Sequence, residues 1–257
     1  MDRSSRTSLG VAIESPDGKR EVNRRIFTAV APRYDFITRV LSYGQDQRWK
    51  RRLIEQARIE PGERVLDLAC GTGDLADRAR ARGARVAGLD LTRAMLSAAR
   101  HRHGSALSFV QADMMHLPFT AARFDVVTAG YALRNLPDLN GGLREIARVL
   151  KPGGRLLSLD FERPSGALVR TLFLGYLWAV GSVLGMVLHR EPETYRYISV
   201  SLSRYPSATE LRARLSAAGF RDILRRPLLG GLMATHTAVR CGPATASKPV
   251  GPAPRVE

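Results

Sequence analysis

VLDLACGTGDLADRA, residues 65–79, joins a short apolar run to a glycine-rich turn and then to a helical pattern. The run ends near Leu68, Gly71 and Gly73 supply the turn, and a helix is expected to begin near Asp74. Glycine lets the backbone approach a ligand closely, and the free N–H groups at a helix N-terminus attract an anion. The stretch therefore predicts a strand, a nucleotide-binding turn and a helix in succession.

The rest of the chain extends this unit into a sheet. From residue 64 onward, short β-rich runs alternate with helix-length amphipathic stretches, which is typical of a parallel sheet with crossover helices. We predict an α/β fold of the Rossmann-like, doubly wound type with about seven strands. The strands are expected at residues 64–69, 85–90, 107–113, 124–130 and 155–161, followed by an antiparallel edge hairpin near FRDILRR (220–226) and MATHTAVR (233–240).

Two further segments are expected to add helices to this sheet. In residues 21–60, apolar side chains such as Phe27, Val30 and Tyr34 recur at helical spacing, which predicts an N-terminal helical cap over the pocket. Residues 163–210 form an insertion before the last strands. Both segments are expected to close over the ligand.

The insertion contains a strongly apolar stretch. Residues 171–188 are 18 residues without a charge, which reaches the length of a transmembrane helix. A single crossing would place the fifth strand and the closing hairpin on opposite sides of a bilayer, although both belong to one sheet. We therefore expect a hydrophobic lid helix or helix pair, broken near Gly181 and Gly185, that packs over the pocket or touches a membrane. An ordinary buried helix is the alternative.

The composition bounds the class of protein. With 257 residues, of which 44% are hydrophobic, the chain can bury one sizeable core, and a single domain is expected over residues 21–240. Residues 1–20 and 241–257 are expected to be a disordered lead-in and tail, because they cannot bury enough apolar surface to offset the entropy of ordering. The two cysteines, Cys70 and Cys241, offer neither a disulfide framework nor a Cys-based zinc site. We expect no bound metal ion, and we expect the protein to be cytoplasmic.

The net charge of +16 would suit a partner rich in phosphate. However, lysine occurs only at positions 19, 50, 151 and 248, and the arginines are scattered through predicted helices rather than gathered in one stripe. We therefore expect no nucleic-acid partner and prefer attraction to an anionic membrane surface.

Three aspartates end the first three strands of the predicted sheet. Asp67 stands four residues before Gly71, where a carboxylate can bind an ammonium group but would repel a pyrophosphate. Asp90 can accept hydrogen bonds from ribose hydroxyls, and Asp113 can reach an adenine amino group. The glycine motif alone also fits the dinucleotide template G-x-G-x-x-G/A. The three acids together favour S-adenosyl-L-methionine, whose carboxylate would lie at the helix N-terminus.

A set of motifs points to one family. The glycine loop and RVLKPGGRLLSLDF (148–161) occur in many methyltransferases, whereas VAPRYDFITRVLSYGQDQRWK (30–50), LRN (133–135) and YRYISVSLSRYP (195–206) are more particular. With them the chain resembles the ubiquinone/menaquinone biosynthesis C-methyltransferase family (UbiE-type), which includes demethylmenaquinone methyltransferases and belongs to the class I S-adenosylmethionine-dependent enzymes. The resemblance implies methylation of a ring carbon of a polyprenylated quinol. Demethylmenaquinol is the preferred acceptor, and a methoxybenzoquinol is left open.

The resemblance also implies which residues bind the cofactor. It places Thr72, Asp90, Asp113 and Met114 at the family's cofactor positions. Together with the residues chosen from their chemistry and their neighbours, the expected cofactor-binding set is Asp67, Gly71, Thr72, Gly73, Asp90, Leu91, Asp113, Met114 and Gly130.

Two segments depart from the family pattern. Gly130-Tyr131-Ala132 stands where Ser-Phe-Gly is usual, so a hydroxyl near the cofactor is absent or is replaced by that of Tyr131. Residues 160–164 read DFERP where Glu-Phe-Ser-Lys-Pro is usual. Both departures bear on the acceptor more than on the class of reaction.

Methyl transfer to carbon would rest mainly on positioning, which can contribute about 7–11 kcal/mol. Arg134, just beyond the fourth strand, is expected to stabilise the quinolate oxygen, with a water taking the proton, because a guanidinium is a poor base. Tyr34 from the cap is expected to orient the quinol or the methionyl group. His189 is the preferred general base, ahead of His116, because histidine titrates near neutrality.

Three other functions are weighed against this one. The apolar stretch 171–188 favours a lipid acceptor over a soluble phenolic or polyketide one. A nucleic-acid methyltransferase is disfavoured, because the chain lacks the Asn/Asp-Pro-Pro-aromatic signature of amino-methylating enzymes after the fourth strand. The three retained aspartates argue against a fold that binds the cofactor without turnover. The expected partners are a lipid quinol and a membrane touched peripherally at its inner face. The oligomeric state stays open between a monomer and a homodimer.

Overall fold

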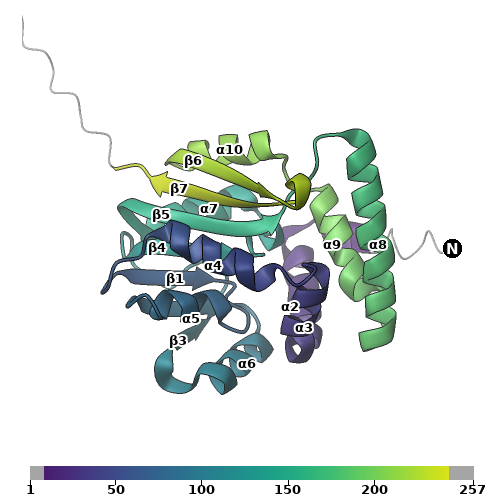
Figure 1. Cartoon of the computed structure of the whole chain (residues 1–257), viewed down its shortest axis with the longest axis horizontal. Helices are drawn as coiled ribbons and strands as arrows, with labels where there is room; N and C mark the ends of the chain where they lie inside the picture. The colour runs from purple at the N-terminus through teal and green to yellow at the C-terminus, as the bar shows by residue number, and fades with distance from the viewer. Residues whose placement is uncertain (1–8, 243–257) are drawn as a thin grey trace, which may run out of the picture.

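The computed structural model describes residues 9–242, which build one seven-stranded sheet (Figure 1). The strands are β1 (Arg64–Leu68), β2 (Arg85–Asp90), β3 (Ser108–Gln111), β4 (Phe124–Gly130), β5 (Leu150–Phe161), β6 (Phe220–Leu228) and β7 (Met233–Arg240). Their order is β3-β2-β1-β4-β5-β7-β6. β7 runs antiparallel to its neighbours β5 and β6, whereas β1 to β5 pair in parallel. The predicted Rossmann-like α/β sheet is confirmed.

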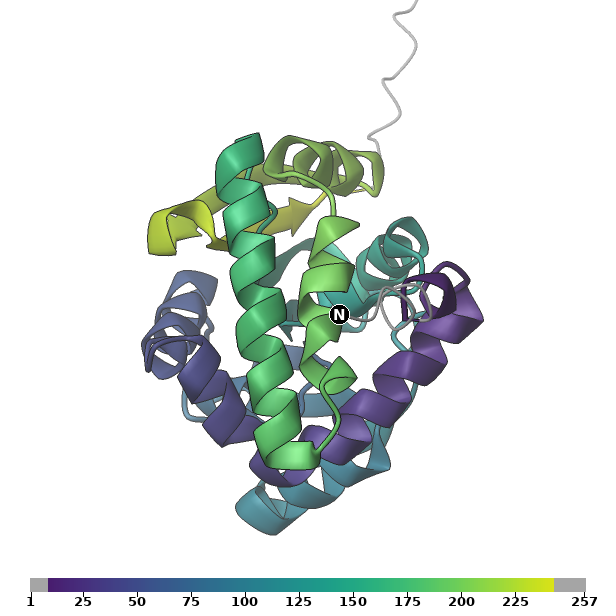
Figure 2. The ribbon, with the colours of Figure 1, turned by 90° about the vertical axis from the view of Figure 1, so that its right-hand side faces the viewer.

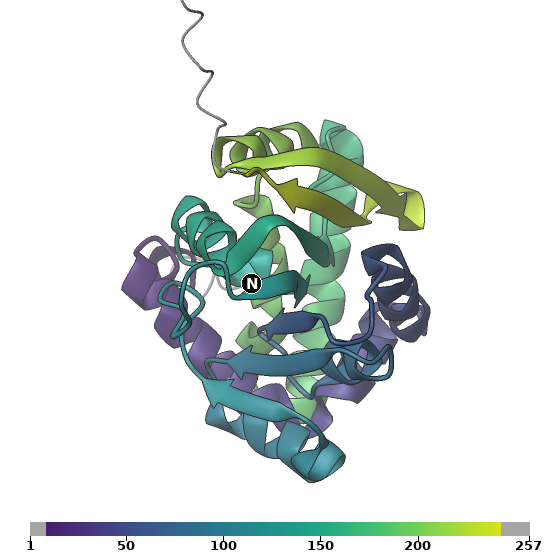
Figure 3. The same cartoon turned by 90° about the vertical axis from the view of Figure 1, so that its left-hand side faces the viewer.

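Helices cover both faces of this sheet. They are α2 (Pro16–Val30), α3 (Tyr34–Leu41), α4 (Asp46–Ala57), α5 (Asp74–Arg80), α6 (Arg93–His103), α7 (Leu139–Val149), α8 (Ala167–His189), α9 (Glu193–Ser203) and α10 (Ala208–Ala217), with short 3-10 turns η1 (Ala31–Arg33), η2 (Gly104–Ala106), η3 (Leu133–Asn135) and η4 (Leu229–Gly231). α4 and α5 lie on one face, and α7 and α10 lie on the other (Figures 1 and 3). The arrangement is doubly wound, as expected.

The strands lie close to their predicted positions, with two differences. β5 begins at Leu150 rather than at residue 155, because the glycine turn continues the pairing with β4 through a register shift, and Gly153 has a φ of 78°. The closing strands form the expected antiparallel hairpin. Of the two hairpin strands, however, only β6 lies at an edge of the sheet, since β7 is inserted between β5 and β6.

The carboxyl ends of the parallel strands are covered by helices from distant parts of the chain. The strand order reverses between β1 and β4, which is where ligands bind in open α/β sheets. α2 and α3 from the N-terminal segment and the α8–α9 pair from the insertion lie across that end (Figures 1 and 2). The predicted cap and lid therefore meet over the same crevice.

The expected disordered lead-in does not extend to residue 20. Residues 9–12 are helical, Leu9 and Ile13 are buried, and α2 begins at Pro16. Ser15 caps α2 by accepting a hydrogen bond from the backbone N–H of Gly18. The expectation is wrong for residues 9–20, because Leu9 and Ile13 belong to a buried apolar cluster that includes Tyr195 and Tyr197, far along the sequence. Residues 1–8 and 243–257 lie outside the described part of the chain.

The insertion forms a hairpin of two helices, and α8 is continuous through Gly181 and Gly185. The expected break is therefore wrong. A Cβ at Gly181 would come 2.9 Å from the carbonyl oxygen of Tyr195, and one at Gly185 would come 2.4 Å from that of Glu191. The two glycines let α9 pack closely against α8, which Figure 2 shows side by side.

α8 is the one helix within residues 9–242 that is long and apolar enough to cross a membrane, and only 17% of its apolar window is buried. A span is excluded by the sheet, because β5 precedes α8, β7 follows it, and the two strands are paired along their length. α8 is consequently neither a membrane span nor an ordinary buried helix, and it presents much of its apolar surface to the outside.

Candidate active site

The glycine turn after β1 is held open by two features. Gly71 and Gly73 have φ values of 53° and 86°, which favour glycine. A Cβ at Gly71 would also meet the ring of Tyr34 at 3.4 Å. The backbone N–H of Gly71 donates to Asp90 Oδ2 at 3.0 Å, and the N–H of Thr92 donates to Asp90 Oδ1 at 2.8 Å. The end of β2 thus fixes the shape of the turn.

A cavity lies in front of this turn, and we call it the loop cavity. It is lined by six of the nine predicted cofactor residues, namely Gly71, Asp90, Leu91, Asp113, Met114 and Gly130. Asp67 and Thr72 line a smaller adjacent cavity that shares Gly130 and Tyr131 with it. Gly73 lines neither cavity and serves as the N-cap of α5.

Asp67 is a buried carboxylate at the end of β1. Its Oδ1 accepts from the hydroxyl of Thr128 at 2.6 Å, and its Oδ2 accepts from the backbone N–H of Ala76 at 3.1 Å. Burial raises the pKa of Asp67 to about 7, although both hydrogen bonds act in the opposite direction. Its charge therefore changes near neutral pH, and a nearby cation would favour the ionised form.

Helix α2 contributes residues that the sequence did not single out. Arg20 Nε lies 2.6 Å from Asp113 Oδ2, and both side chains line the loop cavity. The hydrogen bond to Asp113 raises the pKa of Arg20. Lys19 Nζ donates to the backbone carbonyl of Arg134 at 2.9 Å, and burial followed by the charge of Arg134 lowers the pKa of Lys19 to about 8. These contacts attach the cap to the ends of β3 and β4.

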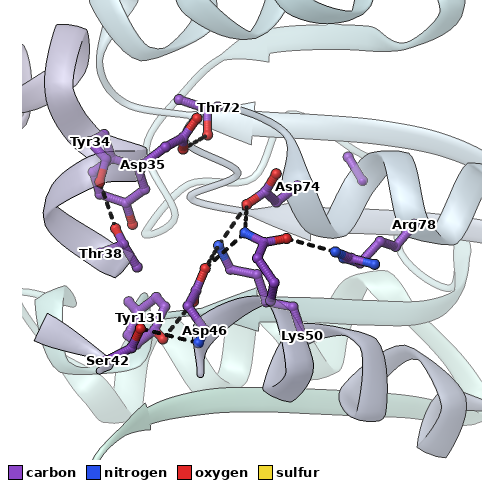
Figure 4. Close-up of polar contacts among 12 residues, drawn as sticks. Tyr34, Asp35, Thr38, Ser42, Asp46, Lys50, Thr72, Asp74, Arg78 and Tyr131 are labelled. Carbon is purple, nitrogen blue, oxygen red and sulfur yellow. Dashed lines mark hydrogen bonds and ion pairs between the residues drawn. The ribbon is translucent and has the colours of Figure 1, made fainter. Parts of the chain in front are cut away.

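A buried ionic cluster joins α4 to the start of α5 (Figure 4). Lys50 Nζ lies 2.8 Å from Asp46 Oδ2 and 2.9 Å from Asp74 Oδ2. Burial alone would lower the pKa of Lys50, but the two carboxylates raise it. Burial would likewise raise the pKa of Asp74, yet Lys50 and Gln47 bring it down to about 2. Lys50 and Asp74 are therefore both charged at neutral pH.

Tyr131 connects this cluster to the cavities. Its hydroxyl donates to Asp46 Oδ1 at 2.8 Å, and its ring lines the loop cavity. The backbone of Tyr131 has a φ of 58°. A Cβ at Gly130 would lie 2.8 Å from Leu75 Cδ1, so the end of the Leu75 side chain would have to move to admit a larger residue. The departure at 130–132 consequently places a phenolic hydroxyl on a buried carboxylate.

A second cavity, which we call the cap cavity, lies between the cap, α9 and the sheet. Its lining comes from α2, α3, η3, α9, the end of β5 and the start of β7, and it is mostly apolar or aromatic, with Arg134 as its charged member. Tyr34 and Tyr131 line both the cap cavity and the loop cavity. The two cavities are therefore neighbours that share an aromatic wall.

Arg134 is buried and held from several sides. Its Nε lies 3.5 Å from Asp160 Oδ1, and its backbone N–H donates to Asp160 Oδ2 at 3.1 Å. Its Nη1 donates to the hydroxyl of Ser201 on α9. The guanidinium lies 5.6 Å from the ring centroid of Phe161 and 5.8 Å from that of Tyr197. Arg134 thus joins η3, β5 and α9 at the wall of the cap cavity.

The other predicted catalytic residues are placed differently. Tyr34 lies over the glycine turn, and burial raises the pKa of its phenol to about 12. His189 lies at the end of α8 and lines neither cavity; its Nε2 is 2.9 Å from the hydroxyl of Tyr195, which does line the cap cavity. Burial and then Arg33 lower the pKa of His189. The structure does not bring His189 to the site, because α8 runs past the cavity before it ends. His116 follows β3 and lines neither cavity.

Little in the sequence pointed to the charged groups that α2 and α4 bring to the site. Asp46 and Lys50 lie within the recognised motif 30–50, and this was the only signal for them. Arg20 gave no signal, because its partner Asp113 is 93 residues away. In the described part of the chain, no group of three or more His, Cys, Asp or Glu side chains could hold a metal ion.

Comparison with known proteins adds the family. A model described as the ubiE/COQ5 methyltransferase family matches residues 16–240. The chain is 38% identical over 217 residues to a demethylmenaquinone methyltransferase of Corynebacterium efficiens, covering 84% of this chain and 93% of that protein. It is 36% identical over 244 residues to a ubiquinone/menaquinone biosynthesis C-methyltransferase of Azotobacter vinelandii, covering 92% and 96%.

Solved structures share the fold. A phosphoethanolamine N-methyltransferase 2 of Haemonchus contortus, in complex with phosphomonomethylethanolamine and S-adenosylhomocysteine, aligns with a TM-score of 0.59 at 17% identity, over 76% of this chain and 53% of that one. An S-adenosylmethionine-dependent methyltransferase of Thermotoga maritima aligns with a TM-score of 0.59 at 17% identity, over 84% and 99%. At such identities the likeness supports the fold alone.

Proposed function

The chain belongs to the ubiE/COQ5 methyltransferase family, and from this we propose that it methylates a ring carbon of a polyprenylated quinol, with demethylmenaquinol as the acceptor. Family membership makes it an S-adenosylmethionine-dependent methyltransferase. The observation that carries the choice of acceptor is the cap cavity, which is apolar and aromatic apart from Arg134 and shares Tyr34 and Tyr131 with the loop cavity. The chemistry of such a lining suits a planar aromatic ring.

The loop cavity and the smaller cavity beside it have the donor and acceptor groups that S-adenosylmethionine requires. Asp90 ends β2 and Asp113 follows β3, and these carboxylates are suited to the ribose hydroxyls and the adenine amino group. Asp67 is suited to the ammonium group, and the bare turn at Gly71 lets the backbone approach the ligand. When bound, S-adenosylmethionine supplies a methyl group on a positively charged sulfur, ready for transfer to a nucleophile.

Arg134 is assigned to the oxygen of the quinol. Its guanidinium lies in the wall of the cap cavity, and its charge favours a deprotonated oxygen beside it. Because a guanidinium does not give up its proton at physiological pH, Arg134 cannot be the base. Asp160 fixes its orientation, and burial raises the pKa of Asp160 while Arg134 opposes this.

The proton of the quinol needs an acceptor, and the lining of the cap cavity contains no carboxylate. Tyr131 lines that cavity, and its hydroxyl donates to Asp46. A quinol proton can pass to the Tyr131 oxygen while the Tyr131 proton passes to Asp46, so the cluster with Lys50 would receive it. We assign this route in place of His189, which lies outside the cavity.

The outer surface of α8 supports a peripheral membrane contact. Leu168, Val169, Leu172, Tyr176, Val183, Met186 and Val187 are each at least 40% exposed. At 100° per residue these positions fall on one face that runs the length of the helix. Arg39 on α3 and Arg190 at the end of α8 are both exposed, and their charges suit anionic lipid. The proposed location is the cytoplasm, at the inner face of the membrane.

Lipid analysis tests the proposed acceptor. In a host from which the gene is deleted, the quinone that lacks one ring methyl group should accumulate, and the intact gene should restore the methylated form. A quinone pool that is unchanged by the deletion would contradict the proposal. An Asp90→Asn copy is expected not to restore the pool, since Asp90 is assigned to the cofactor.

A further inference from the structure

A third hollow opens on the outside of the molecule between the end of α3 and α8, and we call it the α8 groove. Its volume is about 350 Å³, within the range of ligand pockets. Val169, Leu172 and Tyr176 line it from α8, and Leu41 and Tyr43 line it from the end of α3 and the turn that follows. None of its lining residues is charged. The groove therefore suits an apolar ligand.

The α8 groove adjoins the cap cavity. Leu41, Phe161 and Met233 line both. The ring of Phe161 also contacts two other rings, with centroids 6.2 Å from Tyr131 and 6.5 Å from Phe173. Tyr131 lines the cap cavity and Phe173 lines the groove, so a row of aromatic side chains lies between the site and the surface.

The mouth of the groove lies on the exposed apolar face of α8. Tyr43 and Tyr176 are 62% and 40% exposed, and their hydroxyls are hydrogen-bonded at 2.5 Å across the mouth. Val169 and Leu172 belong both to the groove and to the exposed face. A chain that enters here passes directly from the surface proposed to touch lipid.

We propose that the α8 groove binds the isoprenoid chain of the quinol while the ring lies in the cap cavity beside Arg134. This inference rests on the proposed function, which supplies the ring and its chain. The occupant follows from the wall that the two hollows share and from the apolar lining of the groove. A soluble acceptor without a chain would have no use for the groove.

Two acceptor substrates distinguish the contribution of the isoprenoid chain from that of the ring. The first is a naphthoquinol that carries a geranyl chain on the ring, and the second is the same naphthoquinol with a hydrogen in place of the chain. Both are assayed with S-adenosylmethionine in the absence of membranes. The variant is Val169→Asp, which places a charge in the groove at a half-exposed position where folding is not at risk.

The matched control is Val183→Asp. Val183 lies on the same exposed face of α8, is 62% exposed and does not line the groove. We expect Val169→Asp to lower kcat/KM for the geranylated acceptor at least about tenfold, which corresponds to about 1.4 kcal/mol, and to leave that for the chain-free acceptor unchanged. Val183→Asp is expected to change neither value.

Each outcome bears on a distinct claim. Equal losses with both acceptors in Val169→Asp, or no loss with either, would overturn the groove proposal while the proposed function stands. If the wild-type protein methylated neither naphthoquinol, the proposed function would fail and the groove proposal with it. Melting temperatures of both variants equal to that of the wild type show that the comparison is between folded proteins.

Discussion

Asp67 and Tyr131 show how single buried groups set the chemistry of the site. Both lie where a strand ends, and both contact groups from another element: Asp67 accepts from Thr128 on β4, and Tyr131 donates to Asp46 on α4. Burial raises the pKa of each. Their hydrogen bonds therefore decide where protons reside near neutral pH.

Asp67 should make stability depend on pH. Its pKa rises from the ordinary value of 3.8 to about 7 in the folded protein, so the folded state holds the proton more tightly than the unfolded chain. The resulting stability is present below the unfolded value and is lost as the pH rises through the folded one. We expect the unfolding free energy of the wild type, minus that of Asp67→Asn, to fall between pH 4 and pH 7 by at most about 1.4 kcal/mol per pH unit. Chemical denaturation at each pH measures it, and a flat difference would contradict the assignment.

Tyr131→Phe tests the proton route. The ring is kept and only the hydroxyl that donates to Asp46 is lost. We expect kcat to fall about 10²-fold, the lower end of general acid–base effects, with the dissociation constant of S-adenosylhomocysteine unchanged. Tyr195→Phe is the matched control, because its hydroxyl points to His189 rather than into the cluster. A Tyr131→Phe enzyme as fast as the wild type would rule this route out.

At the scale of elements, the site depends on helices from distant parts of the chain packing together. The α8–α9 hairpin supplies Ser201 to Arg134, and α2 supplies Arg20 to Asp113. Close packing of α9 against α8 requires two glycines that are otherwise poor helix formers. Changes in this packing should alter the contact between Ser201 and Arg134, although the glycines do not touch the site.

Gly185→Ala tests the helix pair. The new Cβ would meet the carbonyl oxygen of Glu191 at 2.4 Å, so the connection that leads into α9 must shift, and we expect a loss of about 1–3 kcal/mol in unfolding free energy. Gly175→Ala on the same helix meets nothing within 4 Å and should be neutral or stabilise by up to about 1 kcal/mol. Thermal melting compares them. Equal melting temperatures for the two variants would contradict the packing argument.

The contrast between elements explains what could be predicted from the sequence. The strands and the glycine turn were predicted because their signals are local: apolar runs of strand length, and glycines beside an aspartate. The Arg20–Asp113 and Lys50–Asp74 pairs were not, because they join segments far apart in the chain. His189 failed as a base because the sequence does not reveal where a helix of 23 residues ends relative to a cavity.

At the scale of the whole molecule, one end of the sheet carries both the cavities and the exposed apolar face. The sheet ends, the cap and α8 lie together on that side (Figure 1). A protein so arranged can reach a lipid acceptor without spanning the bilayer. Its net charge of +16 adds attraction to anionic headgroups.

Vesicle flotation tests this orientation. Replacing Val183 and Val187 together by Glu should weaken binding to vesicles that contain phosphatidylglycerol, because two charges then face the lipid. Leu224→Glu, on β6 and 60% exposed, is the control and should bind as the wild type does. Binding should also fall with added salt. Unchanged flotation of the double variant would place the membrane contact elsewhere.

The transfer of a labelled methyl group to the lipid tests the account most directly. The protein is incubated with S-adenosylmethionine deuterated in its methyl group and with vesicles that contain reduced demethylmenaquinone, and the extracted lipid is analysed by mass spectrometry. We predict a quinone that carries the deuterated methyl group on its ring. Consumption of the cofactor only in the presence of a soluble phenol, with the vesicle quinone unlabelled, would contradict it.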